Sequence, residues 1–154
     1  SEQIIGASYG NQRLPLSFII GTDAQRIGTN IQFANKGKIV FGAPQNNLNS
    51  LDEREQAIAD FFDRCGIVYE IPENMLHKQW VKYMMNVGIN QTSAIARATY
   101  TLFQRTEGKP NHPEIFELMV DAMKEVAAVA KGEGVSLSQV DIDDLCTILD
   151  TLDS

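Results

Sequence analysis

The spacing of apolar residues changes near residue 72, and this change constrains the fold more than any other feature of the sequence. Before it, apolar and polar residues alternate, as in strands with one buried face; after it, apolar residues recur at helical spacing. The 154 residues are 44 % apolar and suffice for one ordinary domain or two small ones. The sequence therefore predicts an α/β portion over residues 1–72 and an all-helical portion over residues 73–154.

A strand and a hairpin are expected early in the α/β portion. Residues 14–20 are mostly apolar and predict a strand that ends at Gly21. Alternating apolar residues then flank the sequence Asn-Lys-Gly at positions 35–37: Ile31, Phe33, Ile39 and Phe41. Alternation on both sides of an Asn/Gly sequence predicts a hairpin whose turn lies at residues 35–37.

A helix and a further strand are expected before residue 72. Ser50 and Glu53 have the spacing of a capping box, which would begin the helix, and Gly66 is expected to end it. The apolar face of this helix is expected to contain Ile58, Phe61, Phe62 and Cys65. Residues 67–71 then predict a short strand.

Three helices are expected after Pro72. The first spans residues 73–95. The second begins at Pro113 and ends at Gly132 or Gly134. Its apolar stripe contains Ile115, Met119, Met123, Val126 and Ala130. The third begins at a capping box of Ser138 and Asp141, and its expected buried face contains Leu145, Ile148, Leu149 and Leu152.

Composition excludes several classes of partner. The formal net charge is −7, and residues 113–154 contain two lysines and ten acidic residues, so a nucleic-acid partner is not expected. No apolar run approaches the roughly 20 residues that cross a membrane, and the first residues lack the basic start of a secretory signal. A cytoplasmic protein with reduced thiols at Cys65 and Cys146 is therefore expected. No metal is expected, since His77 and His112 have no ligand-spaced partners.

The most informative motif lies on the first of the three helices. Lys82, Asn86 and Asn90 are spaced four residues apart, which places them along one face of a helix that is otherwise largely apolar. Buried amides without partners are costly, so this polar stripe is expected to face a polar ligand. An ammonium can stabilise or protonate a developing alkoxide, and partial burial would lower the pKa of the lysine. The alternative is a surface lysine beside two amides that bond a neighbouring helix.

The sequence resembles the ketopantoate reductase (2-dehydropantoate 2-reductase) family. The resemblance is carried in order by the strand Gly37-Lys-Ile-Val-Phe-Gly42, the motif Trp80-x-Lys82-x-x-x-Asn86-x-x-x-Asn90 and the helix that begins at Pro113. It implies that residues 1–72 are the C-terminal part of a Rossmann-like NADP-binding domain. Residues 73–154 would be the N-terminal part of an all-helical domain for substrate binding and dimerisation.

The resemblance also implies an activity. Members of the family reduce the 2-keto acid ketopantoate to pantoate with NADPH, in pantothenate (vitamin B5, coenzyme A) biosynthesis. Lys82 would be the general acid at the keto oxygen, and Asn86 and Asn90 would bind the substrate's oxygens. The loop around Ala24 corresponds to a place where the backbone approaches the cofactor. Tyr100 stands where the family can offer a further substrate contact, and a homodimer through the helical domain is implied.

Departures from the family limit what this chain is expected to do alone. The glycine-rich turn that seats the pyrophosphate is missing, because Gly6 and Gly10 have the wrong spacing. The family's later serine and the carboxylate partner of the lysine would both follow residue 154. The chain is therefore expected to be a fragment that contains little of the NADPH site and is inactive by itself.

Two other functions stay open from the sequence. One is a reductase of another 2-keto acid or sugar acid on the same fold. The other is a non-catalytic helical interaction module, in which Asn86 and Asn90 pack against a partner helix and Lys82 is an exposed amine.

Overall fold

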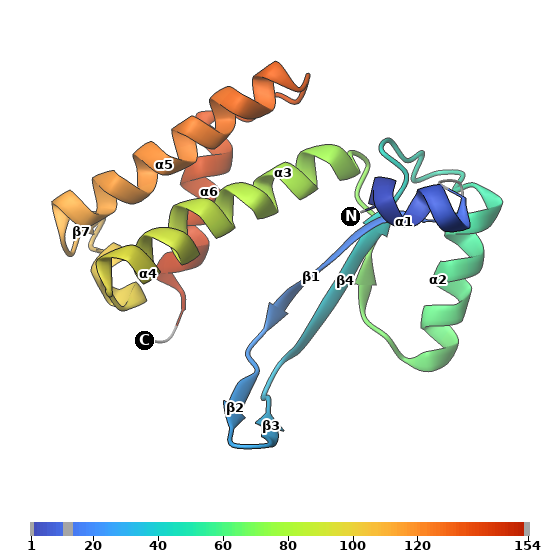
Figure 1. Cartoon of the computed structure of the whole chain (residues 1–154), viewed down its shortest axis with the longest axis horizontal. Coiled ribbons are helices and arrows are strands. Elements are labelled where there is room, and N and C mark those ends of the chain that lie inside the picture. Colours follow the sequence, from blue (N-terminus) through green and yellow to red (C-terminus); the bar gives the residue numbers. More distant parts are fainter. Residues whose placement is uncertain (1, 11–13, 153–154) are drawn as a thin grey trace. The chain divides into compact units, whose positions relative to one another are not determined.

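The computed structural model describes residues 2–10 and 14–152, which form two compact units, Ser1–Lys78 and Gln79–Ser154 (Figure 1). Helix α3, Met75–Met85, contains the boundary between the units. Within the described part of the chain, no helix has both the length and the apolar character that crossing a membrane requires.

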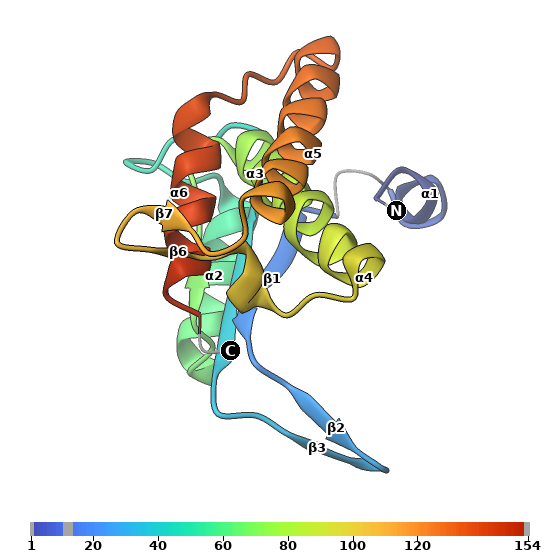
Figure 2. The same cartoon turned by 90° about the vertical axis from the view of Figure 1, so that its left-hand side faces the viewer.

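A long hairpin dominates the first unit. After helix α1, Glu2–Tyr9, which the sequence analysis did not predict, strand β1, Leu16–Thr22, pairs antiparallel with β4, Lys36–Gly42. The hairpin continues through β2, Gln25–Ile27, and β3, Asn30–Gln32, to its tip (Figure 2). The predicted strand over residues 14–20 is confirmed with shifted ends. The predicted turn at residues 35–37 is wrong, because the chain reverses between Ile27 and Asn30.

The glycine at position 37 serves the strand pairing rather than a turn. Pairing of Ile20 with Lys38 and of Thr22 with Lys36 places Gly37 inside the ladder. Its φ is +69°, and an added Cβ would lie 2.4 Å from the carbonyl oxygen of Ile20. Only glycine tolerates both the positive φ and the lack of room for a Cβ. The sequence Asn-Lys-Gly therefore marks a distortion within the strand rather than a turn.

A strand–helix–strand unit follows the hairpin. Helix α2, Glu53–Cys65, connects β4 to β5, Tyr69–Glu70, and the two strands are parallel. The side chain of Asp52, not that of Ser50, caps the helix by accepting from the backbone N–H of Arg54 and Glu55, because the helix begins two residues later than predicted. Gly66, in the left-handed region, ends the helix as predicted.

The buried face of α2 is rotated from the predicted one. Ala59 and Glu55 are buried, whereas Phe61 and Cys65 are exposed. Phe62 packs edge-on against Phe41 of β4, with ring centroids 5.4 Å apart. The covered side of the helix therefore contains Ala59 and Phe62 rather than Phe61 and Cys65.

The predicted helix over residues 73–95 is one helical segment with a wider turn in its middle. The side chain of Asn74 accepts from the backbone N–H of His77 at 2.9 Å and so begins α3. Helix α3 leads into a π-helix, η2, Asn86–Gln91, and then into α4, Thr92–Ala96. The chain leaves the segment at Arg97, whose φ is +51°.

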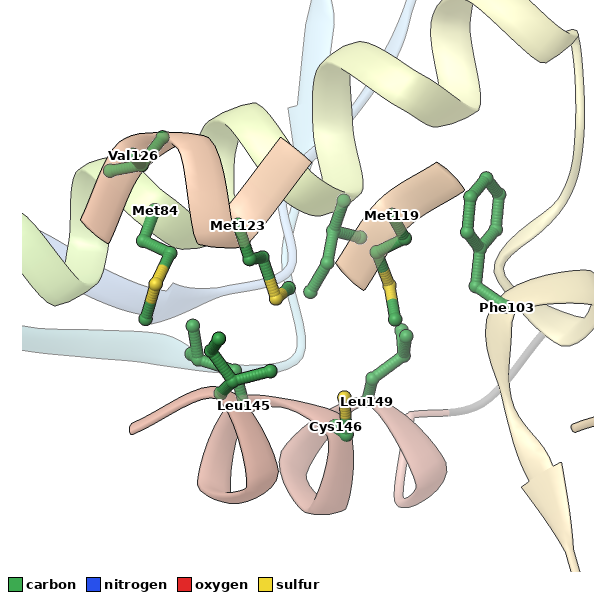
Figure 3. Packing of buried hydrophobic residues seen from close by; sticks show 10 residues of the cluster. Met84, Phe103, Met119, Met123, Val126, Leu145, Cys146 and Leu149 are labelled. Atoms are coloured by element: carbon green, nitrogen blue, oxygen red, sulfur yellow. The ribbon is translucent and has the colours of Figure 1, made fainter. Parts of the chain in front are cut away.

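The second unit packs two long helices against this segment around one apolar core. Helices α5, Pro113–Gly132, and α6, Gln139–Asp150, begin at the predicted Pro113 and at the predicted Ser138–Asp141 capping box. Figure 3 shows the thioethers of Met84, Met119 and Met123 directed toward α6. The predicted stripe of α5 is buried apart from Ile115, which is partly buried. On α6, Ile148 is exposed, and Ile142 and Cys146 are buried beside Leu145 and Leu149. Leu152 lies beyond the end of α6 and is exposed.

The second unit is not wholly helical, which corrects the prediction of an all-helical portion. A 3-10 helix, η3, Tyr100–Phe103, precedes a small hairpin of β6, Arg105–Thr106, and β7, Lys109–Pro110. Arg105 holds this hairpin to α6, because its Nε donates to Asp150 Oδ2 at 2.8 Å. Cys146 is buried and Cys65 exposed, and both thiols are free as predicted.

Candidate active site

Lys82 lies in the last turn of α3 and is half-buried. Its neighbours Trp80 and Val81 are partly buried and pack against the core of the second unit. Burial lowers the pKa of the Lys82 ammonium below its ordinary value. No ion pair or hydrogen bond holds this ammonium within the described residues. Lys82 is thus a cation available to a ligand and more ready than an exposed lysine to release a proton.

Asn86 and Asn90 both belong to the π-helix η2 and lie next to each other. The Asn90 Nδ2 donates to Asn86 Oδ1 at 3.1 Å. Asn86 is half-buried and Asn90 is exposed. Lys82 precedes Asn86 by four residues, which is one helical turn, so the three polar groups follow one another along the same segment. The amides bond each other rather than α5 or α6, and the position of Lys82 on the same face stays a prediction.

Two neighbours of the amides lie in or beside the π-helix, and sequence reasoning missed both. Thr92 Oγ1 donates to the carbonyl oxygens of Gly88 and Ile89, so it satisfies backbone acceptors in the widened turn. Gly88 is buried against Met123 of α5, where an added Cβ would lie 2.4 Å from the Met123 Cγ. The glycine between the two asparagines was the available signal, since it marks a close approach of two helices. Wider helical turns of this kind often occur at functional sites.

Tyr100 is a third residue of the amide cluster. Its hydroxyl donates to Asn90 Oδ1 at 3.0 Å from the 3-10 helix η3. The resemblance placed a substrate contact at this position. The structure shows that the hydroxyl is already engaged with a residue of the polar stripe.

The cluster is suited to an organic acid. An ammonium and amide N–H groups are donors, and carboxylate and keto oxygens are acceptors. Lys82 can stabilise the negative charge that develops on a keto oxygen during reduction, while the amides hold the remaining oxygens. The chemistry available to these side chains is therefore recognition of an oxygen-rich anion and transfer of a proton to it.

The described residues do not fit a dinucleotide cofactor. Ala24 is exposed in the loop between β1 and β2, in the first unit, whereas Lys82 belongs to the second. Asp23 supports that loop by accepting from the backbone N–H of Ala34 and Asn35. The N-terminus of α2 bears Asp52 and Glu53, whose carboxylates would repel a pyrophosphate. Among residues 2–10 and 14–152, no cluster of His, Cys, Asp and Glu could hold a metal ion.

Comparison with known proteins gives one family and one fold. Residues 74–152 match the family model "Ketopantoate reductase PanE/ApbA C terminal". The structure is similar to a dimeric ketopantoate reductase from Staphylococcus aureus, with 20 % identity over 89 % of this chain and 43 % of that one, and a TM-score of 0.68. No match was found among curated proteins.

Two further solved structures share the fold. The 2-dehydropantoate 2-reductase from Geobacter metallireducens GS-15 is 18 % identical over 97 % of this chain and 47 % of that one, with a TM-score of 0.75. The enzyme from Methylococcus capsulatus is 18 % identical over 97 % of this chain and 45 % of that one, with a TM-score of 0.67. The chain therefore spans less than half the length of the solved structures that it matches.

Proposed function

The chain belongs to the ketopantoate reductase family, and from this membership we propose that it is part of an NADPH-dependent reductase that converts ketopantoate to pantoate. In this proposal residues 1–72 are the end of a Rossmann-like nucleotide-binding domain, and residues 73–154 begin the helical substrate domain. The parallel β4–α2–β5 unit supports the first assignment, since such units build nucleotide-binding sheets. The family match over residues 74–152 supports the second.

In the proposed reaction Lys82 is the general acid. A bound nicotinamide cofactor would supply the hydride that reduction of the keto carbon requires, and negative charge would then develop on the keto oxygen. The Lys82 ammonium transfers one proton to that oxygen, which gives the 2-hydroxy acid and leaves a neutral amine. Asn86 and Asn90 hold the hydroxyl or carboxylate oxygens of the substrate. Burial favours the transfer, because the lowered pKa of Lys82 makes its ammonium the stronger acid.

One observation carries the proposal. Lys82 is half-buried and has no partner among the described residues, and it comes four residues before the hydrogen-bonded pair Asn86 and Asn90. The family of this chain is that of a keto-acid reductase. A surface lysine would be solvated and would keep its ordinary pKa. Among the described residues the two asparagines bond each other and Tyr100, and neither amide bonds α5 or α6.

Binding of 2-dehydropantoate to this chain tests the proposal. We expect wild type to bind the keto acid, and Lys82→Met to weaken binding about tenfold or more, because a charge-assisted hydrogen bond is lost. Lys131→Met is the matched control, since Lys131 is an exposed lysine at the end of α5. Equal affinities of wild type and Lys82→Met in a calorimetric titration would contradict the assigned role.

We also propose that the helical unit takes part in a homodimer. The support is the Staphylococcus aureus ketopantoate reductase of the same fold, which is dimeric. Light scattering on the eluting protein distinguishes a mass of twice 17.1 kDa from the monomer mass.

A further inference from the structure

The hydroxyl of Tyr100 and the two site amides form a chain of hydrogen bonds with a defined direction. Tyr100 donates to Asn90 Oδ1 at 3.0 Å, and Asn90 Nδ2 donates to Asn86 Oδ1 at 3.1 Å. Each amide therefore accepts on its oxygen from the group before it. These hydrogen bonds connect η3 to η2, and the last of them ends at Asn86, the amide nearest to Lys82 in the sequence.

The tyrosine determines this direction. The oxygen lone pair of a phenol is partly delocalised into its ring, so the hydroxyl donates more readily than it accepts. A donor at Tyr100 requires the Asn90 oxygen to face it, which turns the Asn90 Nδ2 toward Asn86. That Nδ2 in turn requires the oxygen of Asn86. Without the hydroxyl, both amides could rotate by half a turn and keep the bond between them.

The donor-to-acceptor direction of these hydrogen bonds decides which atoms of Asn86 can bind a ligand. Its oxygen already accepts from Asn90, and its two N–H groups have no partner among the described residues, so these N–H groups are the donors available to a ligand. Asn86 follows Lys82 by four residues, about one helical turn. N–H donors that face a ligand match a carboxylate, which can only accept, and they match the NH₂ group of a primary amide poorly, because that group also donates.

We propose that Tyr100 is a positioning residue that holds the Asn90–Asn86 pair with N–H groups outward, so that the site selects a carboxylate over the corresponding amide. The inference rests on the proposed function for the identity of the ligand. The orientation of the amides does not depend on it and can be measured in the free protein.

The first experiment observes the amides without a ligand. In a nitrogen–proton correlation NMR spectrum of the whole chain, we expect Tyr100→Phe to shift the side-chain NH₂ resonances of both Asn90 and Asn86. Tyr83→Phe is the matched control, because Tyr83 is exposed on α3 and its ring contacts Trp80, while its hydroxyl has no hydrogen-bond partner in the described residues. Unchanged Asn86 resonances in Tyr100→Phe would overturn the positioning role.

The second experiment measures selectivity. We compare the affinities of 2-dehydropantoate and of its primary amide for wild type, Tyr100→Phe and Tyr83→Phe. The preference for the acid is expected to fall about three- to tenfold in Tyr100→Phe alone, the range of one hydrogen bond. An unchanged preference would overturn the role in selectivity. Failure of wild type to bind either compound would count against the proposed function, while the amide resonances would still decide the orientation.

Discussion

Single residues in η2 show how closely the site depends on the packing behind it. Gly88 is buried between the two asparagines, and its Cα faces the Met123 side chain of α5. The approach is possible only because glycine has no Cβ. The position of both amides therefore depends on the absence of one methyl group on the opposite side of the helix.

Replacement of Gly88 by alanine is expected to lower the free energy of unfolding. The new methyl group would lie 2.4 Å from the Met123 Cγ, and overpacking of this kind costs about 1–3 kcal/mol, more than alanine gains as a helix former. Urea unfolding followed by circular dichroism measures the change. Gly132→Ala is the control, because a Cβ there meets nothing within 4 Å, and it should not destabilise the protein. Equal stabilities of the two variants would contradict the close packing at Gly88.

At the scale of elements, ion pairs connect the two strands of the parallel pair to the helix that follows. Glu70 of β5 accepts from Lys38 of β4 at 2.5 Å, and Lys78 of α3 lies 3.5 Å from its other oxygen. The hydrogen bond from Lys38 lowers the pKa of Glu70 below its ordinary value, although burial opposes the change. The side chain is about one third exposed, so solvent screening reduces the stabilisation.

The lowered pKa of Glu70 gives the protein a pH-dependent stability of known sign. Because the folded pKa lies below the unfolded value of about 4.3, the stabilisation is complete above that value and is lost as the pH falls through the folded pKa. We expect Glu70→Gln to be less stable than wild type near neutral pH and to lose less stability on acidification. Urea unfolding at a series of pH values measures both. Parallel pH profiles for the two proteins would contradict a role of Glu70.

At the scale of the whole molecule, the residues proposed to bind an organic acid and the residue expected near the cofactor belong to different units. Lys82, Asn86 and Asn90 belong to the second unit, whereas Ala24 is exposed in the first. The relatives of the same fold are more than twice as long as the part matched here. We therefore expect this chain to bind the keto acid without oxidising NADPH.

We expect this chain alone to leave NADPH unoxidised in the presence of 2-dehydropantoate. The physical reason is the lack, among the described residues, of a glycine-rich turn leading into a helix N-terminus that could seat the pyrophosphate. Loss of the cofactor's fluorescence follows the reaction, with a full-length ketopantoate reductase as the positive control. A rate that rises in proportion to the concentration of this chain would show the expectation to be wrong.

Local signals in the sequence were sufficient for the type and order of most elements. The cap at Gly66, Pro113 in the first turn of α5 and the Ser138–Asp141 capping box are where the sequence analysis placed them. Each of these signals acts between residues at most a few positions apart, so it can be read from the chain alone. Helical spacing likewise predicted that Asn86 and Asn90 are neighbours, and the bond between their side chains agrees with that prediction.

Long-range contacts decided the rest. Gly37 belongs to a ladder with β1, and the Asn90 oxygen accepts from Tyr100. Gly88 of η2 lies against Met123 in a helix far along the sequence. The sequence by itself determined which side chains could bind an acid and on which element they stand. Only the tertiary structure decided which way the amides face and that Lys82 is half-buried, because both depend on partners whose identity no local pattern carries.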